Sequence, residues 1–208
     1  MSKLIPSSSL VGDPKTLTAR VGVLGLQGDF SEHLSMLRGI GVEGVDVRRP
    51  AQLDDIDALI IPGGESTTIG KLAQNYGIIP KLQERAKAGM PVWGTCAGAI
   101  FLATDVPGHP HPLAELMDIT VERNAFGRQI DSFEADLDVD GIPGGPFHAV
   151  FIRAPKITRI GSGVTVLARL EDGSVVAARD ANLLVTSFHP ELTHDERLHR
   201  LFLSLGKG

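Results

Sequence analysis

Short apolar runs alternate with amphipathic segments along the first half of the chain. Four runs are expected to form strands: 21–26, 45–47, 58–61 and 90–93. Four further segments lie between or after these runs and have apolar residues at helical spacing: 30–37, 69–74, 78–88 and 99–103. Asp29 and Glu32 have the spacing of a capping box, which predicts that the first helix begins directly after Asp29. Strands that alternate with helices favour a mainly parallel sheet covered on both faces.

The second half of the chain has shorter strand-like runs and fewer helical patterns. Strands are expected at 119–121, 164–167, 175–178 and 182–186, and a helix at 195–205. Asp172-Gly173 lies between two of these runs and is typical of a hairpin turn, so antiparallel pairing is expected here. The predicted fold class is therefore a three-layer α/β fold. Its central sheet is mainly parallel with helices on both faces, and antiparallel strands occupy the second half.

Length and composition favour a single domain. The chain has 208 residues, of which 42% are hydrophobic, and this is enough to bury a substantial core. We expect residues 20–208 to form this domain. Residues 1–19, which contain two prolines and a run of serines, are expected to form a flexible tail.

Charge, hydropathy and cysteine content exclude several classes of protein. The formal net charge is −5 and the basic residues form no extended block, so neither nucleic acid nor anionic lipid is an expected partner. No run approaches the ~18 uninterrupted apolar residues of a membrane-spanning helix. The single cysteine excludes an intramolecular disulfide and a cysteine-based zinc cluster. It is compatible with a reducing compartment, so a cytoplasmic location is expected.

The only cysteine lies in the segment Gly94-Thr95-Cys96-Ala97-Gly98, between an apolar run and a helical pattern. Small residues on both sides suit a sharp strand–turn–helix junction, at which a nucleophile stands clear of the sheet. The N–H groups that open the helix, together with a nearby imidazole, would favour the thiolate. We therefore predict that Cys96 is a nucleophile. The alternative is a buried structural cysteine, since cysteine is among the residue types most often buried.

A histidine and a carboxylate lie two residues apart in the segment Ser187-Phe188-His189-Pro190-Glu191. The proline disfavours helix, so the segment is expected to be extended, and residues i and i+2 of an extended segment point to the same side. Glu191 can then orient the imidazole of His189 and stabilise its charged form. Cys96, His189 and Glu191 are thus predicted to form a Cys-His-Glu triad. The alternative for this segment is a solvated surface loop.

Two glycines end the third apolar run, in the segment 62–68. Glycines allow backbone N–H groups to approach a ligand closely, so the N–H groups of Gly64 and Ala97 are predicted to hold a developing oxyanion. The serine and threonines that follow are favoured at helix N-caps, and an ordinary capped turn is the alternative. The segment lacks the lysine and the spacing of a phosphate-binding loop, so nucleotide binding is not expected.

The other histidines are not expected to bind a metal. His109 and His111 lie in a proline-rich loop without an obvious acidic or thiol third ligand. Three more lie on predicted helices among charged residues and are expected on solvated faces: His33, His194 and His199.

Six segments carry a resemblance to a known family: 23–28, 62–68, 94–98, 121–129, 151–155 and 187–193. They resemble the class I (triad) glutamine amidotransferases, and within that family the glutaminase subunits of pyridoxal 5′-phosphate synthases. The cysteine and His-Pro-Glu segments are shared across triad amidotransferases. The Gly-Glu-Ser-Thr-Thr and Arg-Asn-x-Phe-Gly-Arg-Gln runs are much more specific to these glutaminase subunits. The resemblance spans about Val21 to Phe202 and implies the flavodoxin-like fold of class I glutamine amidotransferases.

The resemblance implies hydrolysis of L-glutamine to L-glutamate and ammonia. By resemblance, Cys96 attacks the side-chain amide and forms a glutamyl thioester, His189 moves the proton to the departing ammonia, and Glu191 orients His189. The family's glutamine-binding residues match Gly64, Glu65, Ser66, Arg123, Ile152 and Arg153. Gln27 and Gly28 resemble a loop that helps to complete the oxyanion site when the partner binds.

The resemblance also implies a partner. The chain is not expected to hold an acceptor-substrate domain, so its ammonia would be used by a separate synthase subunit. In the family that partner is a (β/α)₈-barrel protein that makes pyridoxal 5′-phosphate and receives ammonia through an interior tunnel. Because the partner does the sugar chemistry, neither a cofactor nor a metal is expected in this chain.

Two other functions compete with this interpretation. The first is a glutaminase subunit of a different synthase, such as that of the histidine pathway, and the narrow run that begins at Arg123 argues against it. The second is a non-hydrolytic chaperone or redox sensor with a cysteine elbow. Such proteins typically place a histidine beside the cysteine, where this chain has Ala97, and they lack a His-Pro-Glu segment.

Overall fold

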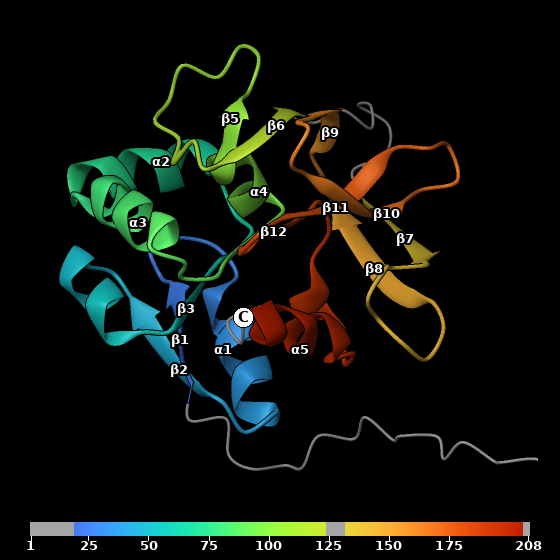
Figure 1. Ribbon diagram of the computed structural model, residues 1–208, viewed down its shortest axis with the longest axis horizontal. Helices are drawn as coiled ribbons and strands as arrows, with labels where there is room; N and C mark the ends of the chain where they lie inside the picture. Colours follow the sequence, from blue (N-terminus) through green and yellow to red (C-terminus); the bar gives the residue numbers. More distant parts are fainter. Residues whose placement is uncertain (1–18, 124–131, 206–208) are drawn as a thin grey trace, which may run out of the picture.

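The structure is a computed structural model that describes residues 19–123 and 132–205 (Figure 1). Residues 1–18 of the predicted tail, and residues 124–129 of the motif at 121–129, lie outside the described residues. The division into a tail and one domain therefore stays a prediction. In the part of the chain that is described, no helix is long and apolar enough to cross a membrane.

Five parallel strands form the first part of a ten-stranded sheet. In spatial order they are β2 (Glu43–Val47), β1 (Arg20–Leu24), β3 (Ala58–Ile61), β4 (Val92–Thr95) and β12 (Leu183–Thr186). Every residue of β3, β4 and β12 is buried, as expected for strands covered on both faces. The carboxyl ends of these three strands lie at one edge of the sheet, where ligands bind in open α/β folds.

The second part of the sheet is mainly antiparallel. Beyond β12 the order continues with β11 (Val175–Asp180), β9 (Lys156–Ile160), β6 (Met117–Glu122) and β5 (Ala103–Asp105), and β10 (Thr165–Arg169) pairs with β11. A separate antiparallel pair consists of β7 (Ser132–Leu137) and β8 (Phe147–Ile152). The predicted fold class is confirmed, including the antiparallel strands of the second half.

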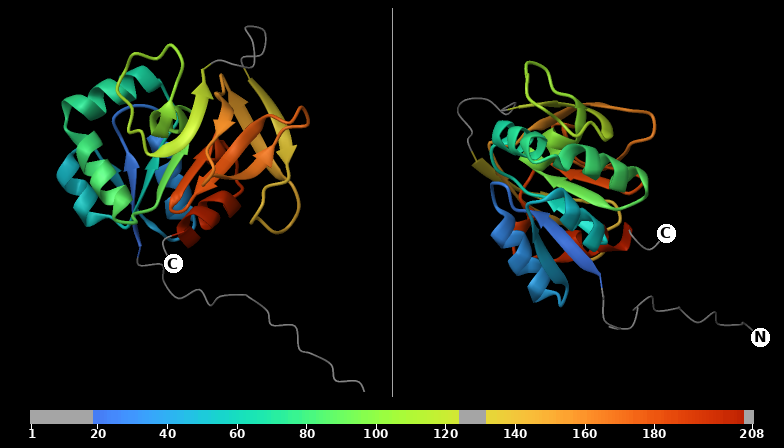
Figure 2. Two further views of the ribbon diagram at one scale, coloured as in Figure 1. Left: turned by 45° about the horizontal axis from the view of Figure 1, so that its top comes forward. Right: turned by 90° about the vertical axis from the view of Figure 1, so that its left-hand side faces the viewer.

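Helices cover both faces of the parallel strands (Figure 2). One layer contains α1 (Phe30–Gly39) and α5 (Arg197–Ser204), and the other contains α2 (Ser66–Asn75), α3 (Ile78–Lys87) and α4 (Ala97–Leu102). Successive side chains of β3 point to opposite faces of the sheet. Ala58 and Ile60 face the layer of α1 and α5, and Leu59 and Ile61 face the layer of α2, α3 and α4. Two short 3₁₀ helices complete the set: η1 (Pro50–Asp55) and η2 (Pro190–Leu192).

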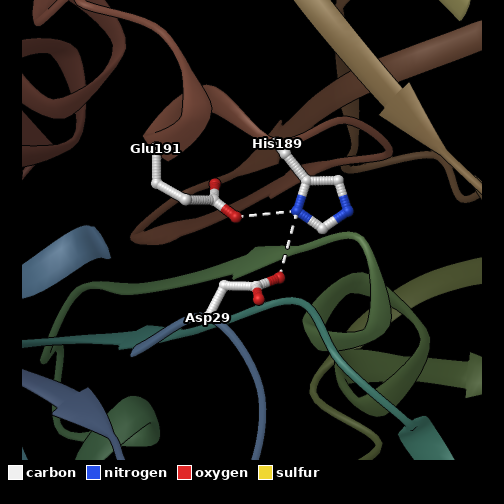
Figure 3. Close-up of side chains that lie close together, drawn as sticks. All are labelled: Asp29, His189 and Glu191. Atoms are coloured by element: carbon white, nitrogen blue, oxygen red, sulfur yellow. Dashed lines mark hydrogen bonds and ion pairs between the residues drawn. The ribbon is translucent and has the colours of Figure 1, made fainter. Parts of the chain in front are cut away.

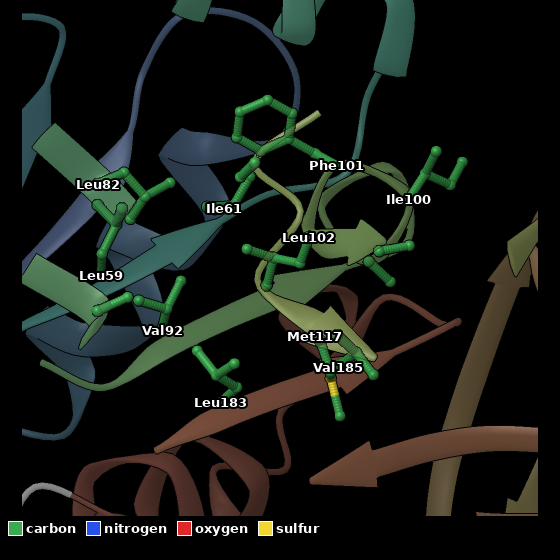
Figure 4. Packing of buried hydrophobic residues seen from close by; sticks show 14 of the residues in the cluster. Leu59, Ile61, Leu82, Val92, Ile100, Phe101, Leu102, Met117, Leu183 and Val185 are labelled. Carbon is green, nitrogen blue, oxygen red and sulfur yellow. The ribbon is translucent and has the colours of Figure 1, made fainter. Parts of the chain in front are cut away.

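The larger apolar cluster lies beneath α2, α3 and α4 (Figure 4). Ile61, Val92 and Val185, from three neighbouring strands, pack in the same cluster as Phe101 of α4, and all four side chains have 0% exposure. Burying one such side chain stabilises the fold by about 1.5–3 kcal/mol. This packing fixes α4 against the sheet, and α4 begins directly after the only cysteine.

Two expectations about polar residues are wrong. Asp29 precedes α1, but its side chain makes no capping hydrogen bond, so the predicted capping box is not formed. His33 and His199 are fully buried instead of solvated, because α1 and α5 turn them toward the indole of Trp93 in the core. His194 is exposed, as expected.

Candidate active site

The strand–turn–helix junction predicted around the cysteine is present between β4 and α4. Cys96 has φ 48° and ψ −104°, a strained backbone conformation for a residue other than glycine. Its N–H donates to the carbonyl oxygen of Thr186 at 2.8 Å, which ties the turn to β12. A Cβ on Gly98 would lie 2.0 Å from the carbonyl oxygen of Ile61, so glycine is needed for α4 to start this close to β3.

Cys96 and His189 line the same cavity, close enough for Cys96 to raise the pKa of His189. The sulfur also lies 3.8 Å from the carbonyl oxygen of Ile152, to which the S–H can donate. Cys96 is 6% exposed, so it is enclosed but reachable from one side. A cysteine and a histidine side by side in one cavity form the arrangement that cysteine-based acyl transfer needs.

His189 and Glu191 follow β12 and contact each other directly (Figure 3). Nδ1 of His189 lies 2.7 Å from Oε1 of Glu191, and both residues are buried. The expectation of an extended segment is wrong beyond His189, because Pro190–Leu192 forms η2. The two side chains still meet, since this single tight turn brings the carboxylate back to the ring.

The contacts of His189 change its protonation. Burial lowers the pKa of His189, but hydrogen bonds and charge interactions with Cys96 and Glu191 outweigh burial and raise the pKa to about 10. Burial raises the pKa of Glu191, and the contact with His189 opposes that rise. The arrangement favours an imidazolium between a carboxylate and a sulfur, and such a cation stabilises a thiolate.

Asp29 is a second carboxylate beside His189, and the sequence analysis missed it. Its Oδ2 lies 3.5 Å from Nδ1 of His189 and approaches this nitrogen from another side than Glu191 (Figure 3). The N–H of Asp29 donates to the carbonyl oxygen of Gly63 at 3.2 Å, so the loops after β1 and β3 are held together. The capping-box interpretation hid this contact, because it assigned the carboxylate to the helix. The signal was the position of Asp29 shortly after a strand that ends at the same edge as Cys96.

A cavity of about 400 Å³ opens beside Cys96. Its walls come from the segments after β1, β3, β4, β6 and β12, from α4, and from β8 and the residue after it: Gln27, Gly28, Asp29, Gly64, Glu65, Ser66, Cys96, Ala97, Ile100, Arg123, Ile152, Arg153 and His189. The size suits a small molecule. The cavity thus brings together all residues predicted from the sequence for the site except Glu191, which lies behind His189.

Two glycines allow the loops around this cavity to touch. Oε1 of Gln27 accepts the N–H of Glu65 at 2.6 Å. Gly64 has φ +146°, and a Cβ there would lie 2.4 Å from Oε1 of Gln27. A Cβ on Gly63 would lie 2.4 Å from Cε1 of His189. The close approach of Gln27 to Gly64 and of His189 to Gly63 therefore requires glycine at both positions. An ordinary tight turn would not require both.

Glu65 caps α2 and contacts a guanidinium. Its carboxylate accepts the N–H groups of Thr67 at 3.2 Å and Thr68 at 2.7 Å, so the N-cap is Glu65 and not one of the hydroxyl residues. Burial raises the pKa of Glu65, but the hydrogen bonds from Thr68 and Thr67 outweigh burial and lower the pKa. Nη2 of Arg123 lies 3.4 Å from Oε1 of Glu65, and Arg153 lines the same cavity. The cavity therefore offers two guanidinium groups, and the carboxylates of Glu65 and Asp29, to a ligand.

Comparison with known proteins places this geometry in a family. A model of the SNO glutamine amidotransferase family matches residues 23–205. The chain belongs to this family. A curated relative from Herpetosiphon aurantiacus, named pyridoxal 5′-phosphate synthase subunit PdxT, is 56% identical over 188 residues, which are 89% of this chain and 99% of the relative. A relative of the same name from Roseiflexus castenholzii is 57% identical over 187 residues, with the same coverage of each chain.

A solved structure supports the same assignment. It is described as a crystal structure of glutamine amidotransferase, is 53% identical, and covers 90% of this chain and 99% of its own, with a TM-score of 0.86. Membership of the SNO family confirms the resemblance inferred from the six sequence segments. It also overturns the alternative of a non-hydrolytic chaperone or redox sensor.

Proposed function

We propose that this SNO family member is the glutaminase subunit of a pyridoxal 5′-phosphate synthase. The observation that carries the proposal is the cavity that Cys96 and His189 line together, with Oε1 of Glu191 2.7 Å from Nδ1 of His189. The relatives named pyridoxal 5′-phosphate synthase subunit support this choice among amidotransferases. The glutaminase subunit of a different synthase is therefore the less favoured function.

The proposed reaction begins when the Cys96 thiolate attacks the side-chain amide carbon of L-glutamine. The carbonyl oxygen becomes an oxyanion, which the N–H groups of Gly64 and Ala97 hold, and one such donor is typically worth ~10²–10³ in rate. The imidazolium of His189 gives its proton to the amide nitrogen as the C–N bond breaks, and ammonia leaves. His189 then takes a proton from water, which attacks the thioester and releases glutamate and the thiolate.

The charges around the cavity suit the free amino acid end of glutamine. The α-carboxylate would pair with a guanidinium of Arg123 or Arg153, and the carboxylate of Glu65 would attract the α-ammonium group. Gly64, Ser66 and Ile152 complete the proposed glutamine site, and Gln27 and Gly28 are proposed to complete the oxyanion site.

The ammonia is proposed to pass to a separate (β/α)₈-barrel synthase subunit that makes pyridoxal 5′-phosphate. This division of labour needs no cofactor and no metal in the present chain. Nucleic acid and membranes are not proposed as partners. The cytoplasmic location inferred from the single cysteine stays a prediction.

Ammonia release from L-glutamine tests the proposal. We expect low activity for the chain alone and a clear rise when the synthase subunit is added, because Gln27 and Gly28 are proposed to complete the oxyanion site only when the partner binds. Cys96→Ala should abolish activity in both conditions, since it removes the attacking sulfur.

A matched control is Ala168→Ser, which changes a small buried residue of β10 that does not line the cavity. It should keep the wild-type turnover. Ammonia release that survives in Cys96→Ala would refute the nucleophile, whereas an unchanged rate on adding the synthase subunit would refute the partner.

A further inference from the structure

A buried pair of histidines lies behind the triad and takes no part in the proposed reaction. His33 of α1 and His199 of α5 both have 0% exposure. Nδ1 of His33 lies 3.0 Å from Nε2 of His199, and both rings pack against Trp93. Burying a polar ring costs free energy unless its nitrogens are used, so the placement of these nitrogens needs an explanation.

The other ring nitrogen of His33 faces the far oxygen of Glu191. Nε2 of His33 lies 3.3 Å from Oε2 of Glu191 and 3.3 Å from Oγ1 of Thr95. Within the described residues, this carboxylate oxygen accepts no hydrogen bond of regular geometry. The regular hydrogen bond of this nitrogen is with Thr95, so the approach of Nε2 to Oε2 offsets only part of the cost of burying this oxygen.

The carboxylate selects one arrangement of protons on the two rings. Burial, and then the neighbouring His199 and His189, lower the pKa of His33, and burial lowers the pKa of His199 to about 3, so each ring is neutral at pH 7. An unprotonated Nε2 on His33 would turn a lone pair toward the oxygen of Glu191, whereas a protonated Nε2 directs its hydrogen between Oγ1 of Thr95 and Oε2 of Glu191. Nδ1 of His33 then accepts the Nε2–H of His199.

This inference rests on the proposed function. We propose that His33 is a positioning residue of the glutaminase, whose Nε2–H holds the far oxygen of Glu191 and so keeps the near oxygen on Nδ1 of His189. Donation runs from His199 to His33, and the Nε2–H of His33 is shared between Oγ1 of Thr95 and Oε2 of Glu191. His189 donates to the other oxygen of the same carboxylate. His33 does not line the cavity and acts only through Glu191.

Replacement of His33 tests its role through kinetics in the presence of the synthase subunit. His33→Leu removes the donor, and we expect kcat for ammonia release to fall about 10-fold to 100-fold, the worth of a hydrogen bond to a charged group. The KM for glutamine should stay the same, because His33 does not reach the cavity. His33→Gln should restore most of kcat, since its amide N–H can donate from nearly the same place.

Leu37→Ala is the matched structural control, because Leu37 is a fully buried residue of the same helix and does not line the cavity. It should lower Tm and leave kcat unchanged. Wild-type kcat in His33→Leu, or an equal loss of kcat in Leu37→Ala, would overturn the proposal.

The pH profile separates positioning from packing. His189 and Asp29 lie on one side of Glu191, with Cys96 beyond His189, and His33 and His199 lie on the other. Three more titratable residues line a surface cavity together with Glu191: Glu32, His194 and Glu196. Loss of the His33 donor should raise the pKa of Glu191 and move the acid limb of kcat/KM up by about one unit. Leu37→Ala should not move this limb, and an unmoved limb in His33→Leu would contradict the role of His33.

Nitrogen-15 NMR of the histidine side chains tests the proton arrangement without any activity. We expect His33 and His199 both to be protonated on Nε2, with signals assigned from His33→Leu and His199→Leu. A proton on Nδ1 of His33 would overturn the proposal even in an active enzyme. Absence of glutaminase activity in the wild type would instead refute the proposed function, and the two failures are therefore distinguishable.

Discussion

At the scale of single residues, one imidazole connects the sulfur to two carboxylates. Glu191 lies 2.7 Å from Nδ1 of His189 with a fully buried side chain, whereas Asp29 lies 3.5 Å away with 42% of its side chain exposed. Attraction between charges weakens with distance and with solvent screening. Glu191 therefore dominates the protonation of His189, and Asp29 is a weaker second support.

Removal of the two carboxylates should have unequal effects. We expect Glu191→Gln to lower kcat for ammonia release about 100-fold or more, because the imidazole loses its orienting charge. Asp29→Asn should lower kcat only a few-fold. The double variant should be less active than Glu191→Gln, since Asp29 partly replaces the missing charge.

Glu84→Gln is the control for the loss of a carboxylate, because Glu84 is exposed on α3 and pairs only with Lys81 among the described groups. It should keep wild-type activity. A double variant as active as Glu191→Gln would show that Asp29 gives no support to His189.

At the scale of elements, the elbow between β4 and α4 depends on a close approach of two backbones. A Cβ on Gly98 would lie 2.0 Å from the carbonyl oxygen of Ile61, and this neighbour is main chain that cannot turn away. The start of α4 also carries the Ala97 N–H that is proposed to hold the oxyanion. Displacing α4 should therefore affect both stability and catalysis.

Gly98→Ala tests this dependence. We expect the free energy of unfolding in urea to fall by about 1–3 kcal/mol, as for an overpacked core, and ammonia release to fall with it. Gly39→Ala is the matched control, because Gly39 ends α1 and a Cβ there meets nothing within 4 Å. It should leave activity unchanged and keep or slightly raise stability. Equal behaviour of the two variants would show that the contact with Ile61 does not constrain the elbow.

The elements of the parallel half were predictable because their strands are buried on both faces. The run at 58–61 is entirely apolar, and β3 has these bounds. The pair β7 and β8 was missed. In β7 the exposed Glu134 and Asp136 alternate with more buried residues. This pattern is short and polar, and it does not show that the strand pairs with β8.

The candidate site was predictable where residue type and local spacing define the chemistry. Cys96 and His189 stand at strand ends with distinctive neighbours, and the structure brings them together. Asp29 and His33 were not identified. Both lie in or beside α1, and their contacts arise only when that helix packs against the segment after β12, which local spacing does not show.

At the scale of the whole molecule, the two helical layers have different tasks. Helices α2, α3 and α4 pack in the larger apolar cluster, which holds the turn at Cys96 between β4 and α4 in place. The layer of α1 and α5 encloses polar groups, among them His33 and His199, between itself and the sheet. The second layer therefore makes the stability of the fold sensitive to pH.

The two buried histidines should destabilise the protein in acid. Their pKa values in the folded state are lowered, to about 3 for His199, while an unfolded histidine titrates near 6.5. The unfolded state binds more protons below pH 6.5, so stability is complete above this pH and is lost as the pH falls toward 3. Each histidine should contribute a slope of up to about 1.4 kcal/mol per pH unit.

Urea unfolding between pH 7 and pH 4 measures this loss, with wild type and His199→Leu compared at each pH. The variant should start from a different stability at pH 7 and should lose less as the pH falls, because one uptake of a proton on unfolding is gone. Carboxylates that titrate in the same range act in both proteins and cancel in the comparison. Parallel pH curves for the two proteins would show that His199 takes up no proton on unfolding, and that it is not held neutral by burial between α5 and the sheet.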